Sequence, residues 1–74
     1  MNQYKYFETE CRNKFTGTKG LGAIRVKFDP IKNSGIVEDI SVWAGTFSWL
    51  YDCGYKKGDS VVGVEFVDSE DDLT

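Results

Sequence analysis

The side chains of this chain that could do acid or base chemistry are carboxylates, because its 74 residues include 12 Asp and Glu but no histidine. Paired carboxylates can share acid and base roles in a cleft that excludes water. A chain of this length has little volume for such a cleft beside its core. We therefore predict no enzyme and no catalytic residue, although three carboxylate pairs could meet in space: Glu8 with Glu10, Glu38 with Asp39, and Asp52 with Asp59.

The two cysteines, Cys11 and Cys53, lie far apart in the sequence and form no C-x-x-C pair, so no metal site and no cofactor is expected. Residues 1–5 are polar and no apolar run follows, as would be needed for a signal peptide or a membrane span of about 20 residues. We expect a cytoplasmic protein that does not enter a membrane, with two reduced and mostly buried thiols. A disulfide from the first strand to the helix is the alternative, which geometry decides.

A glycine-rich stretch, G-T-K-G-L-G at residues 17–22, invites comparison with phosphate-binding loops. A Walker loop carries Lys-Ser or Lys-Thr directly after its last glycine, whereas Ala23 and Ile24 stand here. Residues 19–28, K-G-L-G-A-I-R-V-K-F, are similar to the RNA-recognition signature, but Leu21, Ala23 and Val26 replace its base-stacking aromatics. The stretch predicts a flexible loop followed by an ordinary amphipathic strand.

Charge is unevenly distributed along the chain. Residues 1–32 carry seven Lys or Arg against three acids, a net charge of plus four, and residues 33–74 carry two against nine, a net charge of minus seven. The last residues, 68–74, include four carboxylates that repel one another. We expect one globular domain over residues 1–67 and an acidic, mobile tail over 68–74.

Alternating hydrophobicity predicts the strands that must position these groups. Residues 3–11 are rich in β-favouring aromatics and predict an edge strand, and residues 12–22 predict a loop. Residues 23–29 alternate cleanly, with Ile24, Val26 and Phe28 on one face. Residues 30–35, P-I-K-N-S-G, predict a hairpin turn into a strand over 36–44, in which Ile40, Val42 and Ala44 face the core.

A short helix and a last strand follow. Thr46 as N-cap, apolar Phe47, Leu50 and Tyr51 on one face, and a left-handed Gly54 predict a helix of about two turns. Residues 60–68 predict a strand with Val62, Val64 and Phe66 toward the core. The fold class is therefore mainly β with one short helix, a small α+β domain: a curled antiparallel sheet or small partial barrel of four to five strands.

Residues 49–61, W-L-Y-D-C-G-Y-K-K-G-D-S-V, resemble the W-L-x-x-A-G-F-x-x-G-D-x-V segment of SymE-like toxins of the SpoVT/AbrB-type superfamily. Cys53 and Tyr55 replace the alanine and the phenylalanine of that segment. The resemblance covers thirteen residues. It implies a dimeric β-barrel that acts on nucleic acid, as a toxin-like ribonuclease.

Without catalytic groups, two classes of binding protein remain. The first is a small non-enzymatic protein-binding regulator or inhibitor of phages or mobile elements, a host-defence antagonist aimed at a nucleic-acid-handling protein. Its acidic and aromatic surface would comprise Trp43, Trp49, Tyr51, Glu38, Asp39, Glu70, Asp71 and Asp72. The second is a nucleic-acid-binding small β-barrel, with Tyr4, Tyr6 and Phe15 for stacking and the cations Lys5, Arg12, Lys14, Lys19, Arg25 and Lys27. A homodimer is compatible with both.

Overall fold

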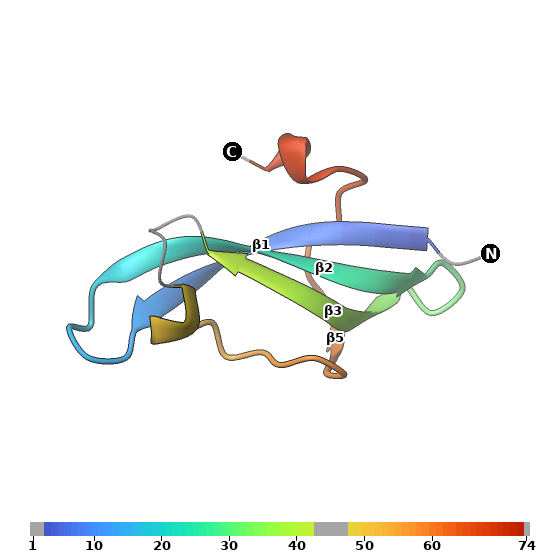
Figure 1. Cartoon of the computed structure of the whole chain (residues 1–74). Helices are drawn as coiled ribbons and strands as arrows, with labels where there is room; N and C mark the ends of the chain where they lie inside the picture. Colours follow the sequence, from blue (N-terminus) through green and yellow to red (C-terminus); the bar gives the residue numbers. More distant parts are fainter. Residues whose placement is uncertain (1–2, 43–47, 74) are drawn as a thin grey trace.

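The protein folds as one curled antiparallel sheet, which confirms the predicted fold class and has the form of a half-barrel (Figure 1). The computed structural model describes residues 3–42 and 48–73. Three long strands form most of the sheet: β1 (Gln3–Asn13), β2 (Lys19–Asp29) and β3 (Ser34–Val42). Two short strands, β4 (Tyr51–Asp52) and β5 (Ser60–Val62), complete the order β4-β1-β2-β3-β5. Single 3-10 turns lie at η1 (Ser48–Leu50) and η2 (Glu70–Asp72).

The first hairpin is longer than its sequence predicts. Residues 12–22 were expected to form a loop, but only residues 14–18 lie outside the strands, and Arg12 pairs directly with Lys19. Gly20 and Gly22 therefore belong to β2, whereas Gly17 lies in the loop. At Gly22, a Cβ atom would lie 2.6 Å from Cys11 Sγ and 3.3 Å from Cys53 Sγ, so glycine is needed there for space.

The second hairpin confirms the predicted turn. Asn33 has a positive φ of 51°, and Asp29 Oδ1 accepts hydrogen bonds from the backbone amides of Ile31 and Lys32. The register between β2 and β3 shifts by one residue between Arg25 and Val26, which marks a β-bulge. Of the predicted inward residues in the third strand, Ile40 packs on the core and Ala44 lies outside the described residues.

The core lies on the concave side of the sheet, between the long strands and residues 53–66, which run beneath them in Figure 1. Phe7 is its centre and makes edge-to-face contacts with Tyr55 and Phe66, at ring-centroid distances of 5.3 and 5.9 Å. Phe66 contacts Phe28 in turn. The buried aliphatic side chains are Ile24, Val26, Val37 and Val61.

The predicted two-turn helix is wrong in extent. Among the described residues of this segment, only 48–50 form a turn, and Tyr51 already belongs to β4, where it pairs with Asn13. Backbone pairing with β1 requires extended conformation, so the helix cannot continue to Gly54. Gly54 does have the expected positive φ, 79°. Thr46 and Phe47, the predicted cap and first apolar residue, lie outside the described residues.

The predicted last strand is shorter than expected and partly out of phase. Val61 is 4% exposed and Val62 68% exposed, the reverse of the prediction. Gly63 has a φ of 76° and ends β5, so the inward alternation restarts one residue later. Val64 and Phe66 then pack on the core, as predicted.

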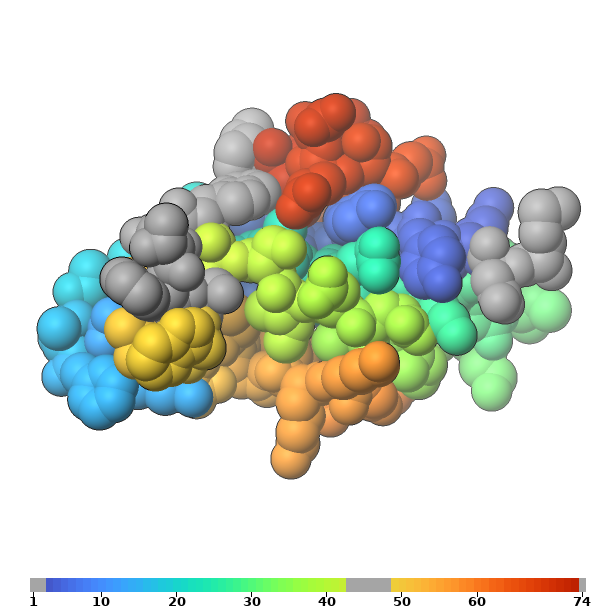
Figure 2. All heavy atoms as spheres, in the orientation of Figure 1, coloured from blue at the N-terminus to red at the C-terminus, as the bar shows by residue number. Residues whose placement is uncertain are grey.

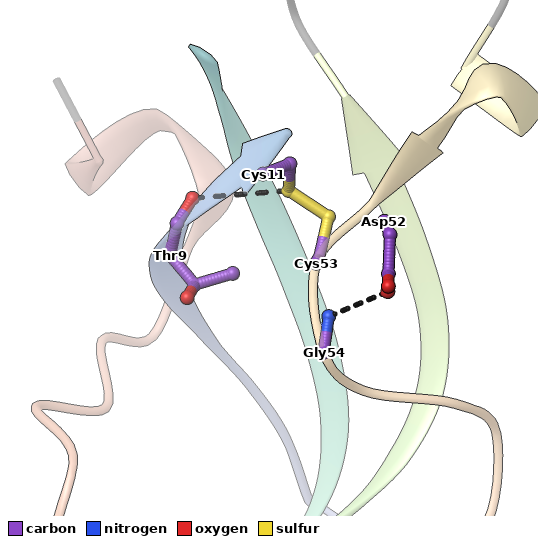
Figure 3. Close-up of a disulfide and its surroundings, with 5 residues drawn as sticks. All are labelled: Thr9, Cys11, Asp52, Cys53 and Gly54. Carbon is purple, nitrogen blue, oxygen red and sulfur yellow. Dashed lines mark hydrogen bonds between the residues drawn. A yellow bond between two sulfur atoms is a disulfide. The ribbon is translucent and has the colours of Figure 1, made fainter. Parts of the chain in front are cut away.

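The prediction of reduced thiols is also wrong, because Cys11 and Cys53 form a disulfide (Figure 3). Their Cα atoms lie 4.1 Å apart, and the bond joins β1 to the chain directly after β4. The sequence separation of 42 residues gives no local signal for this pairing. Among the described residues, Cys11 is completely buried and no cysteine is unpaired.

Candidate functional site

The C-terminal segment crosses the edge of β1 and lies on the outer face of the sheet (Figure 1). Val67 and Tyr6 exchange two backbone hydrogen bonds of 2.9 and 2.8 Å at this edge. Lys5 Nζ lies 2.9 Å from Asp68 Oδ1, and Ser69 Oγ caps η2 by accepting the amide of Asp71. The residues of the predicted tail thus form a 3-10 turn over the outer face of the sheet. On this face, Ala23 of β2 is only 3% exposed.

This placement produces a surface that we call the acidic face, made of Glu38 and Asp39 on β3 and Glu70, Asp71 and Asp72 in η2. Glu70 lines the same small hollow, of about 90 Å³, as Asp39 and Arg25. The cations nearby are already engaged: Lys27 Nζ lies 3.3 Å from Glu38 Oε1, and Arg25 lies over the ring of Tyr4. The three carboxylates of η2 are exposed and add negative charge to this surface.

A second surface lies at the opposite end of β1. We call it the tip: Arg12, Lys14, Phe15 and Lys19 of the first hairpin, with Trp49 of η1. Lys14 N donates a 2.8 Å hydrogen bond to Leu50 O, which joins the hairpin loop to η1. Phe15 is 79% exposed and Trp49 is 69% exposed. The tip and the C-terminal segment lie far apart in Figure 2, where η2 is red and the hairpin loop and η1 are blue and yellow.

The hairpin loop at the tip has a defined conformation. Asn13 Oδ1 accepts hydrogen bonds from the amides of Phe15 and Thr16, at 2.8 and 3.0 Å, and Asn13 N donates to Thr18 O. Thr16 Oγ1 and Thr18 Oγ1 lie 2.9 Å apart. These contacts position Phe15 outward, although the sequence predicted a flexible loop.

The predicted protein-binding residues do not form one surface. Asp39 and Glu70 line one hollow and Asp72 lines another beside Glu8, whereas Trp49 and half-buried Tyr51 line a third hollow with Ile40 and Val42 on the inner side of the sheet. Trp43 lies outside the described residues. The predicted aromatic anchors and acidic groups are therefore separated by the sheet.

The predicted nucleic-acid-binding cations are divided as well. Lys5, Arg25 and Lys27 lie along the other half of the sheet and contact Asp68, Tyr4 and Glu38. Arg12, Lys14 and Lys19 gather at the tip. The association of Phe15 with Trp49 was not predicted, because it depends on β4 pairing with the end of β1 and no local pattern encodes that pairing.

Asp52 and Asp59, one of the carboxylate pairs considered for catalysis, each accept a local backbone hydrogen bond. Asp52 Oδ1 accepts the amide of Gly54 (Figure 3), and Asp59 Oδ2 accepts the amide of Lys56. Over residues 3–42 and 48–73, no cluster of three or more metal-ligating side chains occurs. Within the same ranges, no helix has the length and hydropathy to cross a membrane.

No family model, curated protein or solved structure matches this chain. Residues 49–61, which carry the resemblance to SymE-like toxins, fold as η1, β4, an irregular segment and the start of β5. The resemblance stays a prediction, as does a homodimer.

Proposed function

We propose that this chain is a small, non-enzymatic protein-binding regulator or inhibitor, and that the acidic face binds a basic surface of a nucleic-acid-handling protein. The observation that carries the proposal is the return of the C-terminal segment over the sheet, which brings Glu70 to the hollow shared by Asp39 and Arg25. Carboxylates from two remote parts of the chain thereby form one negative surface. Such a surface raises the rate of association with a positively charged groove and weakens binding to acidic proteins.

The shape of the acidic face favours a macromolecular partner. The hollow between Asp39 and Glu70 has a volume of about 90 Å³. Pockets for small organic ligands usually measure about 300–1,000 Å³. Exposed carboxylates on a shallow surface are instead suited to the rim of a protein interface, where charge governs the association rate.

The proposal includes an origin in a phage or mobile element and a cytoplasmic site of action. Cell fractionation tests the second point. The proposal predicts that the chain is recovered in the cytosolic fraction, and recovery outside that fraction would contradict it.

The test of binding compares three forms of the full chain as bait in a nuclease-treated bacterial lysate. They are the wild type, a charge-reversed variant (Glu70→Lys, Asp71→Lys, Asp72→Lys) and a charge-preserving control (Glu70→Asp, Asp71→Glu, Asp72→Glu). Side chains in η2 are exposed, so the three forms should share one fold, which circular dichroism checks. We expect the wild type and the control to retain the same basic protein, and the reversed variant to lose it.

Two results would refute the proposal. One is retention of the same proteins by the reversed variant at low salt, which would remove the acidic face from binding. The other is that no protein is retained by any of the three forms. The wild type is also tested in an untreated lysate. If it retained a protein there but not in the nuclease-treated lysate, the direct partner would be a nucleic acid rather than a protein.

A further inference from the structure

The tip has an arrangement of charges that the fold does not require. Arg12 and Lys19 lie directly opposite each other in the β1–β2 register, with Lys14 close by in the hairpin loop. Like charges opposite each other across two strands destabilise a sheet. Lys19 Nζ is 3.9 Å from Glu10 Oε1, whereas Arg12 and Lys14 make no ion pair with any described residue.

Exposed aromatic residues accompany these cations. Phe15 and Trp49 are large apolar side chains that lie mostly in solvent, and neither belongs to the core cluster. Two rigid connections hold them near each other: the Lys14–Leu50 backbone hydrogen bond and the pairing of Asn13 with Tyr51. The tip therefore presents aromatic surface in a defined position instead of burying it.

An open hollow of about 850 Å³ lies beside Phe15, and a second hollow of about 300 Å³ lies beside Trp49; Lys14 lines both. The lining of the larger hollow includes Arg12, Lys14 and Phe15 from the hairpin, and Asp52 and Gly54 from the chain after η1. Glu10 and Asp52 bring negative charge to the larger hollow, but Asp52 Oδ1 already accepts a hydrogen bond from the amide of Gly54, and Glu10 Oε1 lies 3.9 Å from Lys19 Nζ. Cys11 and Cys53 also line this hollow, and their disulfide joins β1 to the chain after β4 (Figure 3).

We propose that the tip binds single-stranded nucleic acid, with bases stacked on Phe15 and Trp49 and the phosphates contacted by Arg12, Lys14 and Lys19. Every base has a π-face, so exposed rings beside cations bind single strands with little dependence on sequence. An acidic peptide could form ion pairs with the cations, but its binding would not explain why two aromatic rings are exposed beside them. This site is separate from the acidic face, so it does not rest on the function proposed above.

The experiment measures the fluorescence anisotropy of labelled oligo-dT and oligo-U octamers, titrated with the full chain at 50 mM salt. Because non-specific binding has dissociation constants of about 1–100 µM at physiological salt, the titration extends to about 0.5 mM protein. A poly-glutamate octamer serves as the acidic-peptide probe. Binding should weaken with salt along a log–log slope of about −2, as expected when three cations contact the phosphates of a single strand.

Matched variants locate the site. Phe15→Ala should weaken binding about tenfold, in line with the loss of one base stack. The double variant Lys14→Gln, Lys19→Gln should weaken it and flatten the salt slope, whereas Asp52→Asn, which keeps a side-chain oxygen for Gly54, should strengthen it. Controls at exposed positions away from the tip, Ile31→Ala and the pair Lys56→Gln with Lys57→Gln, should bind like the wild type.

Several outcomes would overturn the proposal. They are absence of any anisotropy change with either octamer, equal losses in the tip variants and in the controls, and binding of the poly-glutamate peptide as tightly as the oligonucleotides. Self-association seen by sedimentation in the same buffer, and abolished by Phe15→Ala, would assign the tip to contact with a second copy of the chain instead.

Discussion

The acidic face and the tip are built in different ways from the same short chain. The tip is fixed by a disulfide, by strand pairing and by backbone and side-chain hydrogen bonds within its loop. The acidic face depends on the two Tyr6–Val67 backbone hydrogen bonds, one 3-10 turn and the Lys5–Asp68 ion pair. The difference suggests a stiff surface suited to stacking against planar groups, and a softer one suited to long-range charge attraction.

The largest expected effect on the free energy of unfolding comes from removing the disulfide, which belongs to the tip and not to the acidic face. The double variant Cys11→Ala, Cys53→Ala should lower the free energy of unfolding by about 4 kcal/mol, the chain-entropy estimate for a loop of 42 residues. Guanidinium unfolding measures this, and added reductant should leave the variant unchanged while destabilising the wild type. A loss below about 1 kcal/mol would mean that strand pairing alone fixes the tip.

The next effect concerns the space that Gly22 leaves for the sulfur atoms. Gly22→Ala should cost about 1–3 kcal/mol of unfolding free energy, because its methyl group would meet Cys11 Sγ. The cost should fall in the Cys11→Ala, Cys53→Ala background, which a double-mutant cycle measures. Equal costs in both backgrounds would assign the clash to the other near neighbour, Ser41 O.

Truncation after Val67 tests how weakly the acidic face is attached. Removing residues 68–74 uncovers Ala23 and breaks the Lys5–Asp68 ion pair, so we expect a loss of about 1 kcal/mol. Oligonucleotide binding at the tip should survive, measured at a temperature where the shortened chain is folded. Global unfolding of the truncated chain at 25 °C would show that η2 is an integral part of the fold.

The smallest effect on stability is expected at Phe15. Phe15→Ala should change the unfolding free energy by less than about 0.5 kcal/mol, because the side chain is exposed. Phe7→Ala, in the centre of the core, is the matched comparison and should cost about 3–5 kcal/mol. If Phe15→Ala destabilised the protein as much as Phe7→Ala, Phe15 would be a packing residue and the tip would lose its aromatic anchor.

Local patterns predicted the parts of this fold that depend on neighbouring residues. The strand around Ile24, Val26 and Phe28 follows from strict alternation, and the turn at Asn33 from its tolerance of positive φ. The errors arose where distant residues decide the local conformation. The pairing of β4 with β1 ended the predicted helix early, and the pairing of β1 with β2 made Gly20 and Gly22 part of a strand rather than a loop.

The candidate surfaces were predictable in residue type but not in arrangement. The sequence identified Trp49, the cations of the first hairpin and the C-terminal carboxylates as exposed functional candidates. It could not show that the C-terminal segment crosses to the outer face, since that path depends on the backbone contact between Tyr6 and Val67. Nor could spacing reveal that the Lys14–Leu50 hydrogen bond joins the segment of Phe15 to that of Trp49.

The most direct test of the account is a crossed measurement on the two surfaces. The charge-reversed η2 variant and Phe15→Ala are each assayed for protein retention from nuclease-treated lysate and for binding of the oligo-dT octamer. We predict that the η2 variant loses protein retention and keeps oligonucleotide binding, and that Phe15→Ala keeps protein retention and weakens oligonucleotide binding about tenfold. If either variant lost both activities while its unfolding curve matched that of the wild type, the acidic face and the tip would form one functional surface, and the account would be wrong.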